Sequence, residues 1–183
     1  CLLITSYEWY KISKKKNYHI FGYFFLIFTF YSAYSLRNNF NDESLIYFLF
    51  IIIICISTDI GGYIFGKILK GPKLTKISPK KTYSGMIGGY FLSIIFINLL
   101  YHYSYLFNGL SVKFTFNTLL LVLLLSTISQ IGDIIVSYFK RLSNVKDTGK
   151  IIPGHGGLLD RIDGMIFAFP FSYITLIVNS KFF

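Results

Sequence analysis

The densest group of charged side chains lies in residues 137–163, SYFKRLSNVKDTGKIIPGHGGLLDRID, within a chain that is otherwise largely apolar. Its basic side chains, which can neutralise a phosphate chain, are Lys140, Arg141, Lys146, Lys150 and Arg161. Its carboxylates include Asp160 and Asp163, whose spacing puts them on one face if the segment is helical. Two such carboxylates suit magnesium, which prefers oxygen ligands and usually keeps water or substrate phosphate oxygens in its shell.

Between the basic residues and the carboxylate pair lies a glycine-rich hinge, Pro153-Gly154-His155-Gly156-Gly157. Glycines let the backbone approach a ligand closely or adopt positive φ. Basic side chains, a carboxylate pair and a glycine hinge together indicate phosphoryl or nucleotidyl transfer. In such reactions cations offset the phosphate charge while the protein positions the reactants. A solvated basic loop between two helices is the alternative explanation, but it accounts for neither the carboxylate pair nor the hinge.

The order and spacing of these residues resemble the phosphatidate cytidylyltransferase, or CDP-diacylglycerol synthase, family. The matching elements are Ser137-x-x-Lys140-Arg141, Lys146-Asp147-x-Gly149, the Pro153–Gly157 run and Leu159-Asp160-Arg161-x-Asp163. A second segment, Ile77-Ser78-Pro79-Lys80-Lys81-Thr82, is similar to a family segment that follows a span containing an aspartate. Family members are usually longer at the N-terminus, and this chain begins at Cys1 within an apolar stretch. We therefore expect an N-terminally truncated member.

The resemblance implies an integral membrane enzyme that transfers the nucleotidyl group of CTP to phosphatidate, giving CDP-diacylglycerol and pyrophosphate. The implied cofactor is magnesium, with a monovalent cation as an open option. The implied partners are CTP, phosphatidate and membrane lipid, with a homodimer left open and nucleic acid excluded.

Composition independently indicates a membrane protein. The 183 residues are 54% hydrophobic and 20% aromatic, and the mean hydropathy is positive, which is not typical of a soluble domain. The net charge of +10 could suit nucleic acid, but the aromatic residues lie inside apolar runs and are not interleaved with the basic ones. In a membrane protein such an excess is typical of loops that face anionic lipid. The two cysteines make neither a disulfide framework nor a zinc site.

We predict an all-α polytopic integral membrane protein in which residues 1–183 form one transmembrane catalytic domain. About five apolar runs are expected to span the bilayer, namely 19–36, 45–66, 84–107, 114–139 and 161–179. Most basic residues fall in three alternate connections, 11–16, 67–81 and 140–160. The positive-inside rule places these connections on the cytoplasmic side of a bacterial membrane. CTP is on the same side, so topology and chemistry agree.

Two aspartates lie inside the predicted spans. Asp59 and Asp133 would each cost roughly 2.5–3.5 kcal/mol at a helix centre, so we expect them to face a polar cavity. One stripe of the fourth run carries Ser126, Gln130, Asp133 and Ser137. Because this stripe leads to Lys140, it predicts a polar groove that climbs from mid-membrane to the cytoplasmic cluster. Packing between helices is an alternative role for such residues, and it explains Ser126 and Gln130 well.

The predicted site residues fall into three groups. The proposed metal ligands are Asp133, Asp160 and Asp163. The proposed catalytic residues are Lys146, Asp147, His155 and Arg161. The proposed substrate-binding residues are Asp59, Ser78, Lys80, Lys81, Ser137, Lys140, Arg141, Gly156 and Gly157. The 67–81 segment has a second explanation as a basic loop that only sets topology.

Two other functions remain open at this stage. In an ion-coupled transporter, Asp59 and Asp133 would lie on an ion pathway. A non-catalytic lipid-binding remnant of a synthase would keep the motifs without turnover. A transporter needs access from both faces of the membrane, whereas every strong polar cluster here is predicted on one side. The enzyme is therefore the favoured interpretation.

Overall fold

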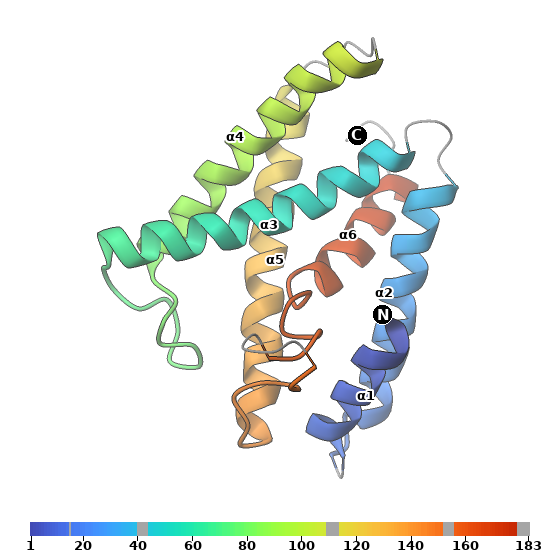
Figure 1. The fold of residues 1–183 in the computed structure, drawn as a ribbon, viewed down its shortest axis with the longest axis vertical. Coiled ribbons are helices and arrows are strands. Elements are labelled where there is room, and N and C mark those ends of the chain that lie inside the picture. The colour runs from blue at the N-terminus through green and yellow to red at the C-terminus, as the bar shows by residue number, and fades with distance from the viewer. Residues whose placement is uncertain (15, 40–43, 109–113, 152–155, 179–183) are drawn as a thin grey trace.

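The computed structural model describes residues 1–14, 16–39, 44–108, 114–151 and 156–178. These residues form six helices, and an isolated β-bridge joins Lys73 to Thr82. The helices are α1 (Leu2–Ser13), α2 (His19–Asn38), α3 (Ser44–Leu69), α4 (Tyr83–Asn108), α5 (Phe116–Leu142) and α6 (Met165–Val178). In Figure 1, α6 lies between α5 and α2, and α3 crosses in front of α5.

Among the residues that the structure describes, four helices are long and apolar enough to cross a membrane: α2, α3, α5 and the part of α4 from Tyr83 to Tyr103. The 26 residues of α3 extend about 39 Å at about 1.5 Å per residue, more than the roughly 30 Å of a hydrocarbon core. The apolar helix α6 has 14 residues and extends only about 21 Å. The prediction of an all-α polytopic membrane protein is confirmed.

The start of the last apolar helix differs from the prediction. Residues 161–164 were assigned to the fifth span, but they form turns, and α6 begins at Met165. These turns follow an irregular segment that leaves the C-terminal end of α5 at Leu142. A polar connection therefore separates two apolar helices, and its last turn carries Asp163.

Helices α3 and α4 pack through glycine. A Cβ atom added to Gly85 would lie 2.7 Å from the carbonyl oxygen of Gly62, and one added to Gly61 would overlap the backbone of Gly88. Small residues at such positions let two helix backbones approach closely. The crossing of α3 and α4 is visible in Figure 1, where the loop that joins them hangs beside α5.

A buried apolar core joins α2, α3, α5 and α6. Its fully buried members include Leu36, Phe50, Ile54 and Leu125. A hydrogen bond between side chains also joins two of these helices. The Thr58 hydroxyl of α3 donates to the Ser126 hydroxyl of α5 at 2.9 Å. Ser126 therefore contributes to helix packing, the role that the sequence left open for it.

Helix α1 packs beside the C-terminal end of α5. The Trp9 indole N–H donates to the His19 carbonyl at 2.9 Å, and the Trp9 ring meets the Phe139 ring edge-on. The Ser143 hydroxyl donates to the backbone carbonyl of Ile12. Figure 1 shows the polar segment between α5 and α6 lying between the end of α5 and α1. This segment is thus enclosed by helices on two sides.

Candidate active site

A polar cavity of about 400 Å³ lies where α3, the loop before α4, α5 and the segment between α5 and α6 meet. Its acidic lining residues are Asp59, Asp133, Asp147, Asp160 and Asp163. Its basic lining residues are Lys80, Lys81, Lys140 and Arg161. Of the predicted polar stripe, Gln130 and Asp133 line this cavity, whereas Ser126 and Ser137 are absent from its described lining. Asp59 of the predicted second span also lines it. Charges of both signs around one cavity suit a ligand that carries phosphates and a cation.

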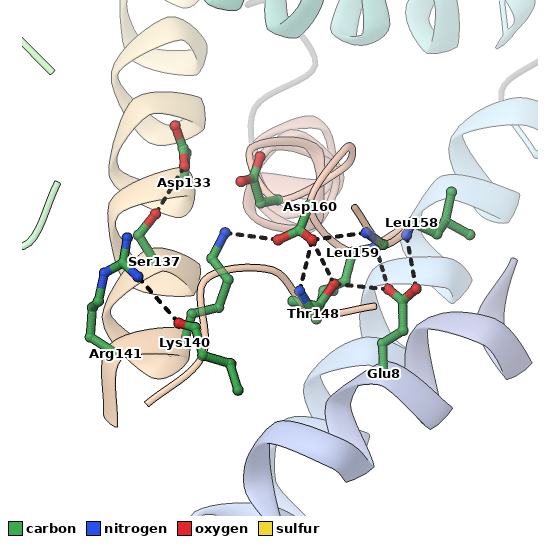
Figure 2. Close-up of polar contacts among 12 residues, drawn as sticks. Glu8, Asp133, Ser137, Lys140, Arg141, Thr148, Leu158, Leu159 and Asp160 are labelled. Atoms are coloured by element: carbon green, nitrogen blue, oxygen red, sulfur yellow. Dashed lines mark hydrogen bonds and ion pairs between the residues drawn. The ribbon is translucent and has the colours of Figure 1, made fainter. Parts of the chain in front are cut away.

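The loop before α4 reaches α5 through Lys81. The Lys81 ammonium forms an ion pair with the Asp133 carboxylate and donates to the backbone carbonyl of Gln130 at 3.3 Å. The Ser137 hydroxyl donates to the other Asp133 oxygen at 3.3 Å (Figure 2). Asp133 is therefore held from two sides, by a loop cation and by a hydroxyl one helical turn away.

Asp133 also meets a second carboxylate. Asp163 is buried, with 7% of its surface exposed, and the Asp133 carboxylate lies near enough to act on its charge. Burial and the neighbouring Asp133 charge raise the pKa of the Asp163 carboxyl well above its ordinary value. Two carboxylates this close repel each other unless a proton or a cation is shared between them. Magnesium is commonly bound by one or two carboxylates together with water and substrate phosphates, so this pair fits it.

Asp160 is engaged differently. One carboxylate oxygen accepts from the Lys140 ammonium at 2.8 Å, and the other accepts from the backbone N–H groups of Thr148 at 2.8 Å and Gly157 at 2.9 Å (Figure 2). Burial alone would raise the pKa of Asp160, but the bonds from Lys140, Gly157 and Thr148 outweigh it and lower the pKa below the ordinary value. Asp160 is thus a charged carboxylate whose two oxygens both have protein donors.

The predicted shared helix face of Asp160 and Asp163 is wrong, because residues 158–164 form turns. Within the part of the chain that the structure describes, no three His, Cys, Asp or Glu side chains are arranged to hold a metal. The structure thus brings Asp133 and Asp163 together as a pair, and it ties Asp160 to Lys140. Both arrangements lie on the wall of the same cavity.

The remaining predicted residues separate into those that line the cavity and those that do not. Lys80, Asp147 and Arg161 line it, as does Asp59 from α3. Ser78 lies in a turn, where its backbone N–H donates to the Thr75 hydroxyl at 3.1 Å. The predicted residues absent from the described cavity lining are Ser78, Ser137, Arg141, Lys146, Gly156 and Gly157.

Arg141 and Lys146 lie near the end of α5. The Arg141 guanidinium donates to the backbone carbonyl of Val145 at 3.2 Å and so closes the turn after the helix. Lys146 is exposed. Gly156 has a φ of +84°, and a Cβ added there would lie 2.9 Å from an Asp160 oxygen. The predicted catalytic residue His155 lies outside the described residues.

Sequence reasoning missed two residues of this region, Glu8 and Thr148. Glu8 is fully buried, and its carboxylate accepts from the backbone N–H groups of Leu158 at 2.9 Å and Leu159 at 2.7 Å. The Thr148 hydroxyl lies 3.1 Å from Glu8 and 3.0 Å from Asp160. A signal was present, because Glu8 is the only carboxylate in the apolar and aromatic stretch of residues 1–10.

The fold and the cavity define a helical membrane protein whose cavity is lined by charged side chains of both signs. Comparison with known proteins identifies its family. Residues 1–178 match the model of the "Cytidylyltransferase family". The chain belongs to this family.

Its relatives include proteins named phosphatidate cytidylyltransferase. One from Staphylococcus aureus (strain COL) is 43% identical over 141 residues, covering 74% of this chain and 51% of the relative. One from Bacillus subtilis (strain 168) is 38% identical over 144 residues, covering 78% and 52%. The chain spans about half the length of the curated relatives it matches. The resemblance identified from the motifs is confirmed.

Proposed function

We propose that this chain carries the catalytic site of a magnesium-dependent phosphatidate cytidylyltransferase. The observation that carries the proposal is the Asp133–Asp163 carboxylate pair on the wall of a cavity that also holds Lys80, Lys81 and Arg161. Nucleotidyl transfer needs metal and cations to offset phosphate charge and a site that orients the reactants. The family and the names of its members supply the substrates, CTP and phosphatidate.

Asp133 and Asp163 would hold the magnesium ion, whose chemistry is to neutralise charge on the triphosphate. Lys80, Lys81 and Arg161 bind the remaining phosphate oxygens. Lys81 must exchange Asp133 for a substrate phosphate when both substrates are bound, because one ammonium cannot fully serve both partners.

A phosphate oxygen of phosphatidate attacks the α-phosphorus of CTP. The bond from that phosphorus to the bridging oxygen of the β-phosphate breaks, and pyrophosphate leaves with the electron pair. A phosphate monoester is largely dianionic at neutral pH, so the attacking oxygen needs no strong general base. His155, Asp147 and Lys146 keep their predicted catalytic roles in this proposal. An assisting monovalent cation and a homodimer stay open options within it.

Phosphatidate keeps its acyl chains in the bilayer while its phosphate enters the cavity. The basic segments beside the cavity favour the cytoplasmic side by the positive-inside rule. The structural feature in support is that Asp59 and Asp133, on two long apolar helices, line the same cavity as exposed Lys80 and Arg161. The cavity thus joins the membrane-spanning region to the polar loops, as transfer between a lipid and a soluble nucleotide requires.

The test is label transfer in membranes that contain the expressed chain. Incubation with phosphatidate, magnesium and CTP labelled at the α-phosphate should place the label in the lipid fraction, whereas label at the γ-phosphate should appear in pyrophosphate. Chelation of magnesium should stop both. Phosphatidate-independent ion uptake into vesicles without label transfer would favour the transporter and overturn the proposal, and lipid binding without transfer would favour the non-catalytic remnant.

A further inference from the structure

Glu8 reaches from α1 into the polar segment although it is far away in the sequence. It has 0% of its surface exposed, and its carboxylate accepts from the backbone N–H groups of Leu158 and Leu159 (Figure 2). A buried charge is costly unless hydrogen bonds satisfy it. The bonding donors belong to the turn that carries Asp160, so the carboxylate and this turn stabilise each other.

Thr148 joins Glu8 to Asp160. Its hydroxyl lies 3.1 Å from a Glu8 oxygen and 3.0 Å from an Asp160 oxygen, and its backbone N–H donates to Asp160 at 2.8 Å. A hydroxyl has one proton, so it donates to one of the two carboxylates at a time. Asp160 in turn accepts from Lys140. A continuous chain of polar contacts therefore runs from α1 to the end of α5.

The motif glycines leave room for Glu8. A Cβ atom added to Gly149 would lie 2.7 Å from a Glu8 oxygen, and one added to Gly157 would lie 2.6 Å from the same oxygen. Real Cβ atoms essentially never come so close. Gly157 was predicted to bind substrate. Its contacts also explain why glycine stands there, since any side chain would meet the Thr148 hydroxyl and the Glu8 carboxylate.

We propose that Glu8 is a positioning residue for the transfer site, and that it fixes the turn bearing Asp160, Arg161 and Asp163 against α1. Glu8 is absent from the described lining of the cavity, so it acts through the backbone of that turn. This inference rests on the proposed function for its effect on turnover. Its effect on the turn itself does not depend on what the cavity binds.

The test compares two variants with a matched control in the full chain. Glu8→Gln keeps the size but replaces one acceptor oxygen by an N–H₂ group that faces backbone N–H donors. Thr148→Val leaves α1 unaltered and removes the hydroxyl that contacts both Glu8 and Asp160. The control is Thr5→Val, because Thr5 is equally buried on α1 and its hydroxyl donates within its own helix, to Leu2 at 3.0 Å.

Hydrogen exchange of residues 156–164 and turnover number are measured together. Loss of a hydrogen bond to a charged group should speed exchange in this segment at least about tenfold in both variants while leaving α3 and α4 unchanged. Turnover at saturating CTP should fall by a similar factor. Because the two variants share one contact, the double variant should lose less than the product of the single losses. Thr5→Val should change neither quantity.

Unchanged exchange in residues 156–164 would overturn the proposal, as would an acceleration spread equally over all helices, since that would mean a general role in folding. If Glu8→Gln does not fold, Gly149→Ala tests Glu8 from the loop side, because its added Cβ would lie 2.7 Å from a Glu8 oxygen, and it should speed exchange in the same segment. A wild-type chain that transfers no label disproves the proposed function, whereas the exchange measurement still decides the role of Glu8.

Discussion

Two aspartates three residues apart should respond in opposite ways to the same substitution. Asp160→Asn removes the negative member of a buried ion pair whose partner, Lys140, is 8% exposed and whose charged atoms lie 2.8 Å apart. Removing one member of a buried pair costs roughly 3–5 kcal/mol because the other charge is left uncompensated. The new amide would also direct N–H groups at the backbone donor of Thr148 or Gly157. We expect a large loss of stability.

Asp163→Asn should spare stability and remove metal dependence. It removes a buried charge and its repulsion by Asp133, the two effects that raise the pKa of Asp163, so the free energy of unfolding should stay equal or rise. The variant also removes one of the two proposed magnesium ligands, and the loss of magnesium affinity should exceed the roughly 10–100-fold typical of outer-shell partners.

Thermal unfolding in detergent and magnesium titration of label transfer measure the two effects. For a chain of this size, 3–5 kcal/mol corresponds to a decrease of roughly 6–20 °C in unfolding temperature. Asp160→Asn should show this decrease, and Asp163→Asn should not. Unfolding of Asp160→Asn at the wild-type temperature would refute the role of the buried ion pair, and turnover of Asp163→Asn with the wild-type magnesium requirement would refute the metal assignment.

Three further predictions follow from the same contacts. Lys81→Met should lower kcat/KM for CTP by roughly 10–100-fold, because the cavity loses a charged hydrogen-bond donor. The control Lys76→Met, at an exposed position outside the described cavity lining, should leave kcat/KM unchanged. Equal kcat/KM values in the two variants would exclude a role for Lys81 in binding. Gly61→Ala should destabilise the α3–α4 contact by about 1–3 kcal/mol through overpacking. The control Gly62→Ala, where the nearest atom to an added Cβ is 3.8 Å away, should unfold at nearly the wild-type temperature. Equal unfolding temperatures in the two variants would contradict close packing at Gly61. Because the pKa of Asp160 is lowered in the folded protein, its ion pair should stabilise the fold above the unfolded pKa of about 3.9, and this stability should be lost as pH falls through the lower folded value. The unfolding temperature of Asp160→Asn should therefore depend less on pH in acid than that of the wild type. The same dependence on acid pH in both proteins would refute this linkage.

The membrane helices and the cavity were predictable because their signals are local. Apolar runs of sufficient length identify spans, and a charge inside a span identifies a cavity. The stripe that contains Gln130 and Asp133 needed only the helical period. Each of these inferences depends on residues within one helix, and each agrees with the structure.

The arrangement around Asp160 was not predictable in the same way. The expected helix face for Asp160 and Asp163 assumed a helix, but backbone donors from Thr148 and Gly157 hold Asp160 in a turn. The turn is also held by Glu8, which lies about 150 residues earlier in the chain. Contacts of this range leave no periodic trace in the sequence, so only the lone charge in an apolar stretch could have drawn attention to Glu8.

We propose above that Asp133 and Asp163 together hold a divalent cation where the CTP phosphates bind. Manganese is a paramagnetic substitute for magnesium, and its electron paramagnetic resonance titration against the purified protein measures this directly. We expect bound manganese that magnesium displaces, with affinity weakened more than about tenfold in both Asp133→Asn and Asp163→Asn. Unweakened manganese binding in the two variants would contradict the claim.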